Sequence, residues 1–190
     1  FGITALLCFL SLFLFLGHSN FHTRGEPREA LVAFAMLEDG NWTLPITNGT
    51  DIAYKPPLFH WAIASLSSII SEVNEYTSRM PSAIALMVMV LVGYAFYAKR
   101  RGKELAFLTS LITLTNFEVH RAGVACRVDM LLSALMVLAL YALYQWTERK
   151  MKGIPWWGIL CLSGAFLTKG PVGVVLPCAV VAAFAWIRNM

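Results

Sequence analysis

Apolar residues gather in long runs along this chain, and shorter polar segments separate the runs. A helix that crosses the hydrocarbon core of a bilayer needs about 20 apolar residues. The pattern therefore predicts an all-α, polytopic transmembrane helical bundle, in which the shorter runs gain length from flanking residues. The predicted spans are Phe1–Leu16, Pro81–Ala98, Leu105–Phe117, Met130–Trp146, Trp156–Leu167 and Val172–Ile187.

Two apolar runs need separate interpretation. The run Leu58–Ile70 is short for a span and rich in small residues, so it is predicted as a membrane-dipping or interfacial helix in an outer loop over residues 18–80. The run Phe1–Leu16 fits a truncated first span, with the apolar part of a secretory signal as the alternative. Because the chain begins with Phe1, we expect residues 1–190 to be the N-terminal part of a longer transmembrane domain.

The basic residues predict how the bundle is oriented. One basic cluster, at residues 99–103, follows the second predicted span, and another, at 149–152, follows the fourth. Two spans separate the clusters, which places both on one face, and an excess of lysine and arginine is typical of the cytoplasmic face. The opposite, outer face then collects residues 18–80, 118–129 and 168–171.

Composition supports a membrane location and limits the function. Hydrophobic residues make up 58% of the chain, which exceeds the apolar fraction of an ordinary soluble domain. The net charge of +4 is modest, and we expect no nucleic-acid partner. The four cysteines and four histidines show no metal-binding spacing. We therefore predict no metal site and no cofactor, while leaving a divalent ion open.

One amphipathic helix is predicted inside the outer loop, over Glu29–Leu37. Its apolar face is formed by Leu31, Phe34 and Ala35, which recur at helical spacing. The Asp-Gly-Asn run at 39–41 predicts the end of the helix. We expect the helix to lie flat on the membrane with its apolar face towards the lipid.

The segment that leads into this helix is a candidate anion site. Pro27 suits a first helical turn, and a helix N-terminus offers unpaired N–H donors to an anion. Arg28 adds a planar fork suited to phosphate. The plainer alternative is that Glu26 and Glu29 only complement the helix dipole.

Further charged residues on the outer face are candidates for binding and catalysis. Lys55 is held by two following prolines and suits a phosphate, although a lysine at a membrane edge also fits simple snorkelling. Asp129, with Arg127 beside it, abuts the fourth span, and an ordinary solvated ion pair is the alternative. Lys169 runs against the positive-inside trend and suits a lipid phosphate, or is a tolerated loop charge.

Several short motifs follow one another in a fixed order along nearly the whole chain. They are Glu26–Arg28, 36–42 (MLEDGNW), 55–58 (KPPL), 79–83 (RMPSA), 127–130 (RVDM) and 167–171 (LTKGP). In this combination the chain resembles the dolichyl-phosphate-mannose protein mannosyltransferase family, most closely its bacterial branch, which includes the lipid A aminoarabinose transferases. The resemblance implies the N-terminal part of a C-type glycosyltransferase (GT-C).

The resemblance also implies roles for single residues. The family usually carries an Asp-Glu pair in the first outer loop, and its Asp is the proposed catalytic acid/base group. The corresponding pair here is Gly25-Glu26, which makes Glu26 the substitute base. Arg28 matches the arginine after that pair, Lys55 matches the lysine that meets the lipid phosphate, and Asp129 matches a second acidic residue.

The implied function is transfer of a sugar from a polyprenyl-phosphate donor to a lipid or protein acceptor at the outer face. The implied location is the bacterial inner membrane, with the active site facing the periplasm. Aminoarabinose transferases often have Glu before the lysine, near a metal, but Tyr54 stands here and no metal is predicted. The alternative is a transporter or flippase of an anionic lipid-linked substrate, which would place ionisable groups within its spans.

Overall fold

The structure is a computed structural model, and it describes residues 1–47 and 51–188. Positions 48–50 of the predicted outer loop lie outside the described residues. In chain order the elements are α1 (Gly2–Phe13), α2 (Gly25–Asp39), β1 (Ile46–Thr47), β2 (Asp51–Ile52), α3 (Leu58–Ile70), α4 (Glu75–Arg101), α5 (Lys103–Thr115), α6 (Phe117–Gly123), α7 (Val128–Glu148), α8 (Trp156–Lys169) and α9 (Val172–Ile187). The two short strands pair antiparallel within the outer loop.

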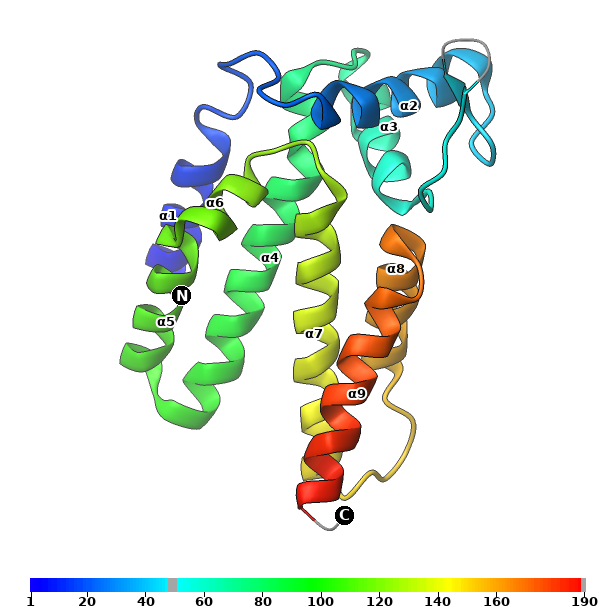
Figure 1. Cartoon of the computed structure of the whole chain (residues 1–190). Coiled ribbons are helices and arrows are strands. Elements are labelled where there is room, and N and C mark those ends of the chain that lie inside the picture. Colours follow the sequence, from blue (N-terminus) through cyan, green and yellow to red (C-terminus); the bar gives the residue numbers. More distant parts are fainter. Residues whose placement is uncertain (48–50, 189–190) are drawn as a thin grey trace.

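The longer helices form an upright bundle, and α2 lies across one end of it (Figure 1). We call the end that carries α2 the outer end. Helix α4 contacts α1, α5 and α7, while α7 also contacts α8 and α9. The turn from α4 to α5 and the loop from α7 to α8 lie at the opposite end (Figure 1). Both basic clusters, at 99–103 and 149–152, therefore share one face, as predicted.

Among the described residues, two helices are long and apolar enough to cross a membrane, namely α4 with 27 residues and α7 with 21. They contain the predicted spans Pro81–Ala98 and Met130–Trp146. Helix α4 begins well before its predicted span because Asn74 and Thr77 form a capping box. The Asn74 side chain accepts from the Thr77 N–H at 3.0 Å, and the Thr77 hydroxyl accepts from the Asn74 N–H at 3.0 Å.

The core of the bundle lies where α1, α4 and α7 meet. Its buried members are Cys8, Leu12, Leu16, Ala83, Ala85, Leu86, Met89, Val90, Leu114, Met130 and Ala134. Small residues let backbones approach closely, as is usual between membrane helices. At Gly173, for example, an added Cβ would lie 2.7 Å from the Ala165 backbone, so glycine is required where α9 crosses α8.

A second core joins α2 and α3 to the segment before α7. Its buried members are Val32, Ala33, Met36, Phe59, Ile63, Ala64, Cys126 and Val128. This core fixes α2 above the start of α7, and so brings the charged residues of the outer loop next to the segment that carries Asp129.

The helix in the outer loop is longer than predicted, and two charged residues lie on the face that packs on the protein. The predicted end is confirmed, since Gly40 caps α2 with a left-handed φ of 67°. The helix begins at Gly25 rather than Glu29. Leu31 and Phe34, predicted as its apolar face, are 48% and 47% exposed. These two side chains therefore do not pack on the protein. The face that does carries the carboxylates of Glu26 and Glu29, which are ion-paired there.

Candidate active site

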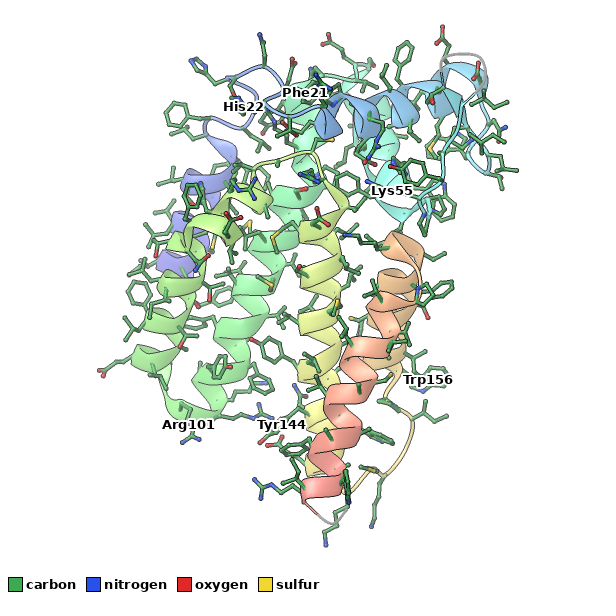
Figure 2. All side chains as sticks on the ribbon, in the orientation of Figure 1. Phe21, His22, Lys55, Arg101, Tyr144 and Trp156 are labelled. Atoms are coloured by element: carbon green, nitrogen blue, oxygen red, sulfur yellow. The ribbon has the colours of Figure 1, made fainter. Side chains whose placement is uncertain are left out.

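Most of the candidate residues gather at the outer end of the bundle. Figure 2 places Lys55 and His22 at this end, and Arg101 and Tyr144 at the opposite end. The carboxylates of Glu26, Glu29 and Asp129 lie at this end, and each has at least one cationic partner. They differ in how far water reaches them, and this difference determines what chemistry each can do.

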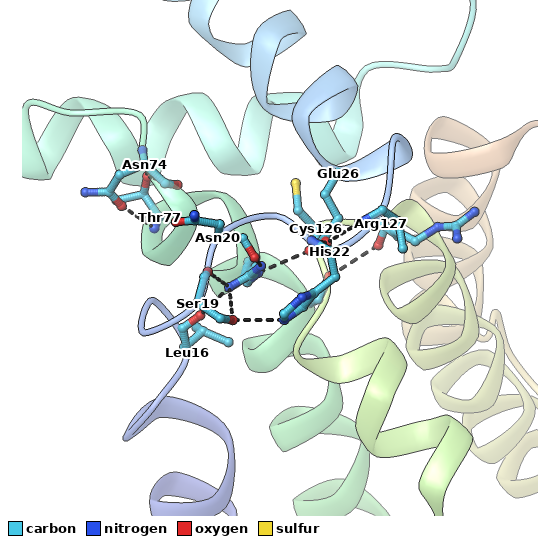
Figure 3. Close-up of polar contacts among 12 residues, drawn as sticks. Leu16, Ser19, Asn20, His22, Glu26, Asn74, Thr77, Cys126 and Arg127 are labelled. Atoms are coloured by element: carbon cyan, nitrogen blue, oxygen red, sulfur yellow. Dashed lines mark hydrogen bonds and ion pairs between the residues drawn. The ribbon is translucent and has the colours of Figure 1, made fainter.

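Glu26 is 2% exposed and accepts four hydrogen bonds (Figure 3). Its Oε2 accepts from the backbone N–H groups of His22 at 2.8 Å and Thr23 at 3.3 Å. Its Oε1 accepts from Arg79 Nε at 3.1 Å and from the Cys126 N–H at 3.0 Å. One carboxylate thus ties together the loop before α2, the start of α4 and the loop before α7.

The charge of Glu26 is stabilised despite its burial. Burial alone raises the pKa of this carboxyl. The backbone hydrogen bonds from Cys126 and His22, together with the Arg79 guanidinium, outweigh burial and hold the pKa below its ordinary value. Glu26 is therefore an ionised carboxylate whose acceptor sites already face protein donors.

Arg79 completes this buried ion pair. It is 2% exposed, and its remaining N–H groups donate to three backbone carbonyls of the loop after α1 (Figure 3). These carbonyls belong to Leu16 at 2.9 Å, Ser19 at 2.8 Å and Asn20 at 2.9 Å. The sequence reading gave Arg79 no role beyond its place in a motif, although a lone arginine at the entry to an apolar span is itself a signal of a buried partner.

Glu29 is the centre of a second cluster, which the sequence reading did not foresee. The carboxylate is 3% exposed. Its Oε1 accepts from Lys55 Nζ and lies 3.5 Å from an Arg28 nitrogen, while its Oε2 lies 2.7 Å from His60 Nε2. Burial alone raises the pKa of Glu29, but hydrogen bonds from His60 and Lys55 and the charge of Lys55 outweigh it and lower the pKa to about 2.

The third cluster is more open to solvent. Asp129, in the first turn of α7, accepts from Lys169 Nζ at 2.6 Å and lies 3.5 Å from Arg127 Nε. The three side chains are 42%, 45% and 48% exposed, in that order. Lys169 ends α8, so the fold joins residues 40 positions apart in the sequence. The three residues were each predicted as site residues, and the structure brings them together.

The position of the family's usual Asp lies between these clusters. Gly25 occupies it here, and a Cβ added to Gly25 would lie 4.0 Å from the Arg127 guanidinium. Arg28 is 54% exposed and Lys55 22% exposed at the side chain, so both predicted phosphate-binding cations reach the surface. Within residues 1–47 and 51–188, no group of three or more His, Cys, Asp or Glu side chains is arranged to hold a metal.

Comparison with solved structures defines the class. The chain matches the crystal structure of ArnT from Cupriavidus metallidurans bound to undecaprenyl phosphate, with a TM-score of 0.85 and 21% identity, over 99% of this chain and 36% of that chain. The apo ArnT structure matches with a TM-score of 0.84. The fold is therefore a GT-C-like transmembrane helical bundle, which confirms the predicted fold class.

The family follows from the sequence. The family model for dolichyl-phosphate-mannose-protein mannosyltransferase matches residues 54–189, and the chain belongs to this family. It is 27% identical, over 97% of its length and 35% of the relative, to the undecaprenyl phosphate-alpha-4-amino-4-deoxy-L-arabinose arabinosyl transferase of Shewanella sediminis. A second such transferase, from Proteus mirabilis, is 31% identical over 80% of this chain and 28% of the relative. The chain thus spans about a third of the length of these relatives.

Proposed function

We propose that this chain forms part of an integral-membrane glycosyltransferase that moves a sugar from a polyprenyl-phosphate donor to a lipid or protein acceptor. The reaction takes place at the outer end of the bundle, which we assign to the periplasmic side of a bacterial inner membrane. The basic clusters at 99–103 and 149–152 lie at the opposite end and support this orientation. The relatives named for undecaprenyl-phosphate sugar transfer support the reaction class.

The observation that carries the proposal is that two clusters of cations lie at one end of the membrane bundle, Lys55 and Arg28 around Glu29, and Lys169 and Arg127 around Asp129. A polyprenyl-phosphate donor keeps its tail in lipid and its phosphate at the surface. The cations needed for that phosphate must then lie at the end of the bundle and be reachable from it. Lys55 and Arg28 meet both conditions.

In the reaction, an acceptor oxygen attacks the anomeric carbon, and the bond between that carbon and the phosphate oxygen breaks. Negative charge develops on the departing phosphate, and preorganised cations stabilise such charge more in the transition state than in the ground state. Lys55 supplies ammonium N–H donors, and Arg28 supplies a planar fork. Lys169 and Arg127 lie beside Asp129 and extend the positive surface.

Between the two carboxylates predicted as bases, Asp129 is the better placed to accept a proton from a hydroxyl acceptor. It is 42% exposed at the side chain, whereas Glu26 is enclosed by four donors. A general base needs hydrogen-bond access to the group that it deprotonates. We therefore assign the base to Asp129, and we assign Glu26 to holding the site together.

We also propose that the described residues hold no catalytic metal. Each of the carboxylates Glu26, Glu29 and Asp129 already has a cation within ion-pair distance. These cations repel a divalent ion from all three carboxylates. Chelation of divalent ions is expected to leave the transfer rate of the full-length enzyme unchanged.

The test is sugar transfer by the purified full-length protein, reconstituted with a labelled polyprenyl-phosphate sugar and candidate acceptors. Lys55→Met is expected to lower transfer about 100-fold because the leaving phosphate loses a preorganised cation. Arg121→Gln is the matched control, since Arg121 is an outer-end cation that is 55% exposed and paired only locally with Glu118. It is expected to transfer at the wild-type rate.

Lipid mass spectrometry of cells extends the same test. Deletion of the full-length gene is expected to accumulate one polyprenyl-phosphate sugar and to remove the corresponding glycan from a surface lipid or protein. Absence of transfer by the purified protein, together with movement of the lipid-linked sugar across vesicles, would overturn the transferase in favour of a flippase.

A further inference from the structure

Side chains from three separate parts of the outer end form one cluster, with the Glu29 carboxylate at its centre. Glu29 comes from α2, Lys55 from the turn before α3, and His60 from α3 itself. The Glu29 and His60 side chains are 4% and 1% exposed, whereas Lys55 is 22% exposed. The carboxylate and the imidazole are thus enclosed in protein, and the ammonium lies at the edge, where a ligand can reach it.

We propose that Glu29 and His60 are positioning residues that aim the Lys55 ammonium at the donor phosphate. The inference rests on the proposed function, because Lys55 is the phosphate-binding cation assigned there. A lysine side chain is long and flexible, and by itself it holds its charge in no fixed place. Here Glu29 Oε1 accepts one of the three ammonium N–H groups, which leaves two for phosphate oxygens.

His60 fixes the carboxylate that holds the lysine. Its Nε2 lies 2.7 Å from Glu29 Oε2, so the two carboxylate oxygens face different partners and the carboxylate plane cannot turn. Within the described part of the chain, His60 Nδ1 is buried without a hydrogen-bond partner. His60 is therefore directed at Glu29 through Nε2.

The charges of the cluster fit an anionic ligand. Glu29 carries the one negative charge of the cluster and lies between the two cations Lys55 and Arg28, so the cluster is positive overall. Arg28 lies 3.5 Å from the same Oε1 that accepts from Lys55. The buried Glu29 carboxylate thus lies within ion-pair distance of both phosphate-binding cations.

Two roles for Glu29 predict opposite results when its charge is removed. If Glu29 acted only as a counterion, its neutralisation would remove the negative charge that offsets Lys55 and would strengthen phosphate binding. If Glu29 positions Lys55, neutralisation frees the lysine and weakens the interaction, most of all in the transition state. The sign of the change therefore distinguishes the two roles.

The experiment is a double-mutant cycle on the full-length protein in lipid nanodiscs, with undecaprenyl phosphate as the binding probe and kcat and KM of sugar transfer as the second readout. The variants are Lys55→Met, Glu29→Gln and the double variant, with Glu118→Gln as an exposed carboxylate control. Glu29→Gln is expected to weaken binding about tenfold and to lower kcat about tenfold. The double variant is expected to match Lys55→Met alone, because residues that act through one another are not additive.

Four results would overturn the proposal. Tighter binding by Glu29→Gln would leave only the counterion role, and an additive double variant would reveal a structural effect unrelated to Lys55. Wild-type binding by Lys55→Met would remove the phosphate site of the proposed function and this inference with it. If Lys55→Met weakens binding while Glu29→Gln does not, the proposed function stands and only the inference is lost.

A second variant keeps the test valid if Glu29→Gln does not fold. His60→Gln retains the Glu29–Lys55 contact and removes the imidazole that orients the carboxylate. It is expected to lower kcat about threefold with a smaller change in KM, while thermal unfolding stays close to that of the wild type. Wild-type kcat for a folded His60→Gln would remove His60 from the proposal.

Discussion

Two of the ion pairs at the outer end, Glu26–Arg79 and Asp129–Lys169, differ in their exposure to solvent. Glu26 and Arg79 are each 2% exposed, and nearly every donor and acceptor they carry is satisfied by protein. Asp129 and Lys169 are 42% and 45% exposed, with oxygens and N–H groups open to solution. The closed pair stabilises the arrangement of three segments, and the open pair is free to meet substrate. Accessibility thus separates charged residues that can contact substrate from those that hold the surrounding segments together.

The largest expected effect comes from breaking the closed pair. Arg79→Met leaves Glu26 buried and without its cation, and loss of one partner of such a pair costs about 3–5 kcal/mol. We expect the full-length protein to unfold at a much lower temperature, or to fail to accumulate, as measured by thermal unfolding in detergent. The double variant Glu26→Leu with Arg79→Met removes both charges and is expected to regain part of the stability. An Arg79→Met protein as stable as the wild type would contradict the structural role.

Breaking the open pair is expected to affect catalysis instead. Asp129→Asn keeps the shape of the side chain but removes the base, and general base catalysis contributes about 10²–10⁴-fold to a rate. We expect transfer to fall by at least about 100-fold while the unfolding temperature changes little. Steady-state kinetics and thermal unfolding of the same preparation measure both. A stable variant with full activity would return the base assignment to Glu26.

The pH dependence of stability tests a second buried carboxylate, that of Glu29, which is as enclosed as that of Glu26. The folded protein lowers its pKa from 4.5 to about 2, so its contribution to stability is complete above about pH 4.5 and is lost as the pH falls towards about 2. The unfolding temperatures of the wild type and Glu29→Gln are expected to differ most above pH 4.5 and to converge on acidification. A difference that is constant between pH 6 and pH 2.5 would contradict the paired, ionised carboxylate.

The smallest expected effect is the change in unfolding temperature caused by Lys169→Met. Exposed ion pairs contribute roughly 0–1 kcal/mol, so the unfolding temperature is expected to stay within a few degrees of the wild type. Activity is expected to fall severalfold because Asp129 loses the cation at 2.6 Å that orients it. Comparison with Arg79→Met in one unfolding series tests whether burial, rather than the presence of a salt bridge, sets the energetic weight.

The sequence predicted the order of helices better than it predicted their partners. Apolar run length gave α4 and α7, and the resemblance identified Lys55 and Asp129 as candidates. The pairing of Asp129 with Lys169 depends on how α8 returns along α7, and no local pattern carries that information.

Residues at the buried ends of ion pairs were the hardest to predict. Glu29 looked like a dipole partner in a first helical turn, and His60 lay inside an apolar run without metal spacing. Packing of α2 on α3 brings the two side chains into contact and buries them together, and the sequence pattern does not show this contact. The face of α2 that packs on the protein was missed for the same reason, because its buried carboxylates carry no signal in the apolar pattern.

The contacts of Glu26 also determine the order in which this part of the protein can fold during translation. Its first buried partner, Arg79, follows 53 positions later, and the Cys126 N–H follows 100 positions later. At about 5–20 residues per second, a ribosome needs roughly 3–10 s to reach the first and 5–20 s to reach the second. During membrane insertion the loop after α1 has to stay hydrated while α4 is translated, and it closes over the carboxylate only after the segment before α7 has emerged.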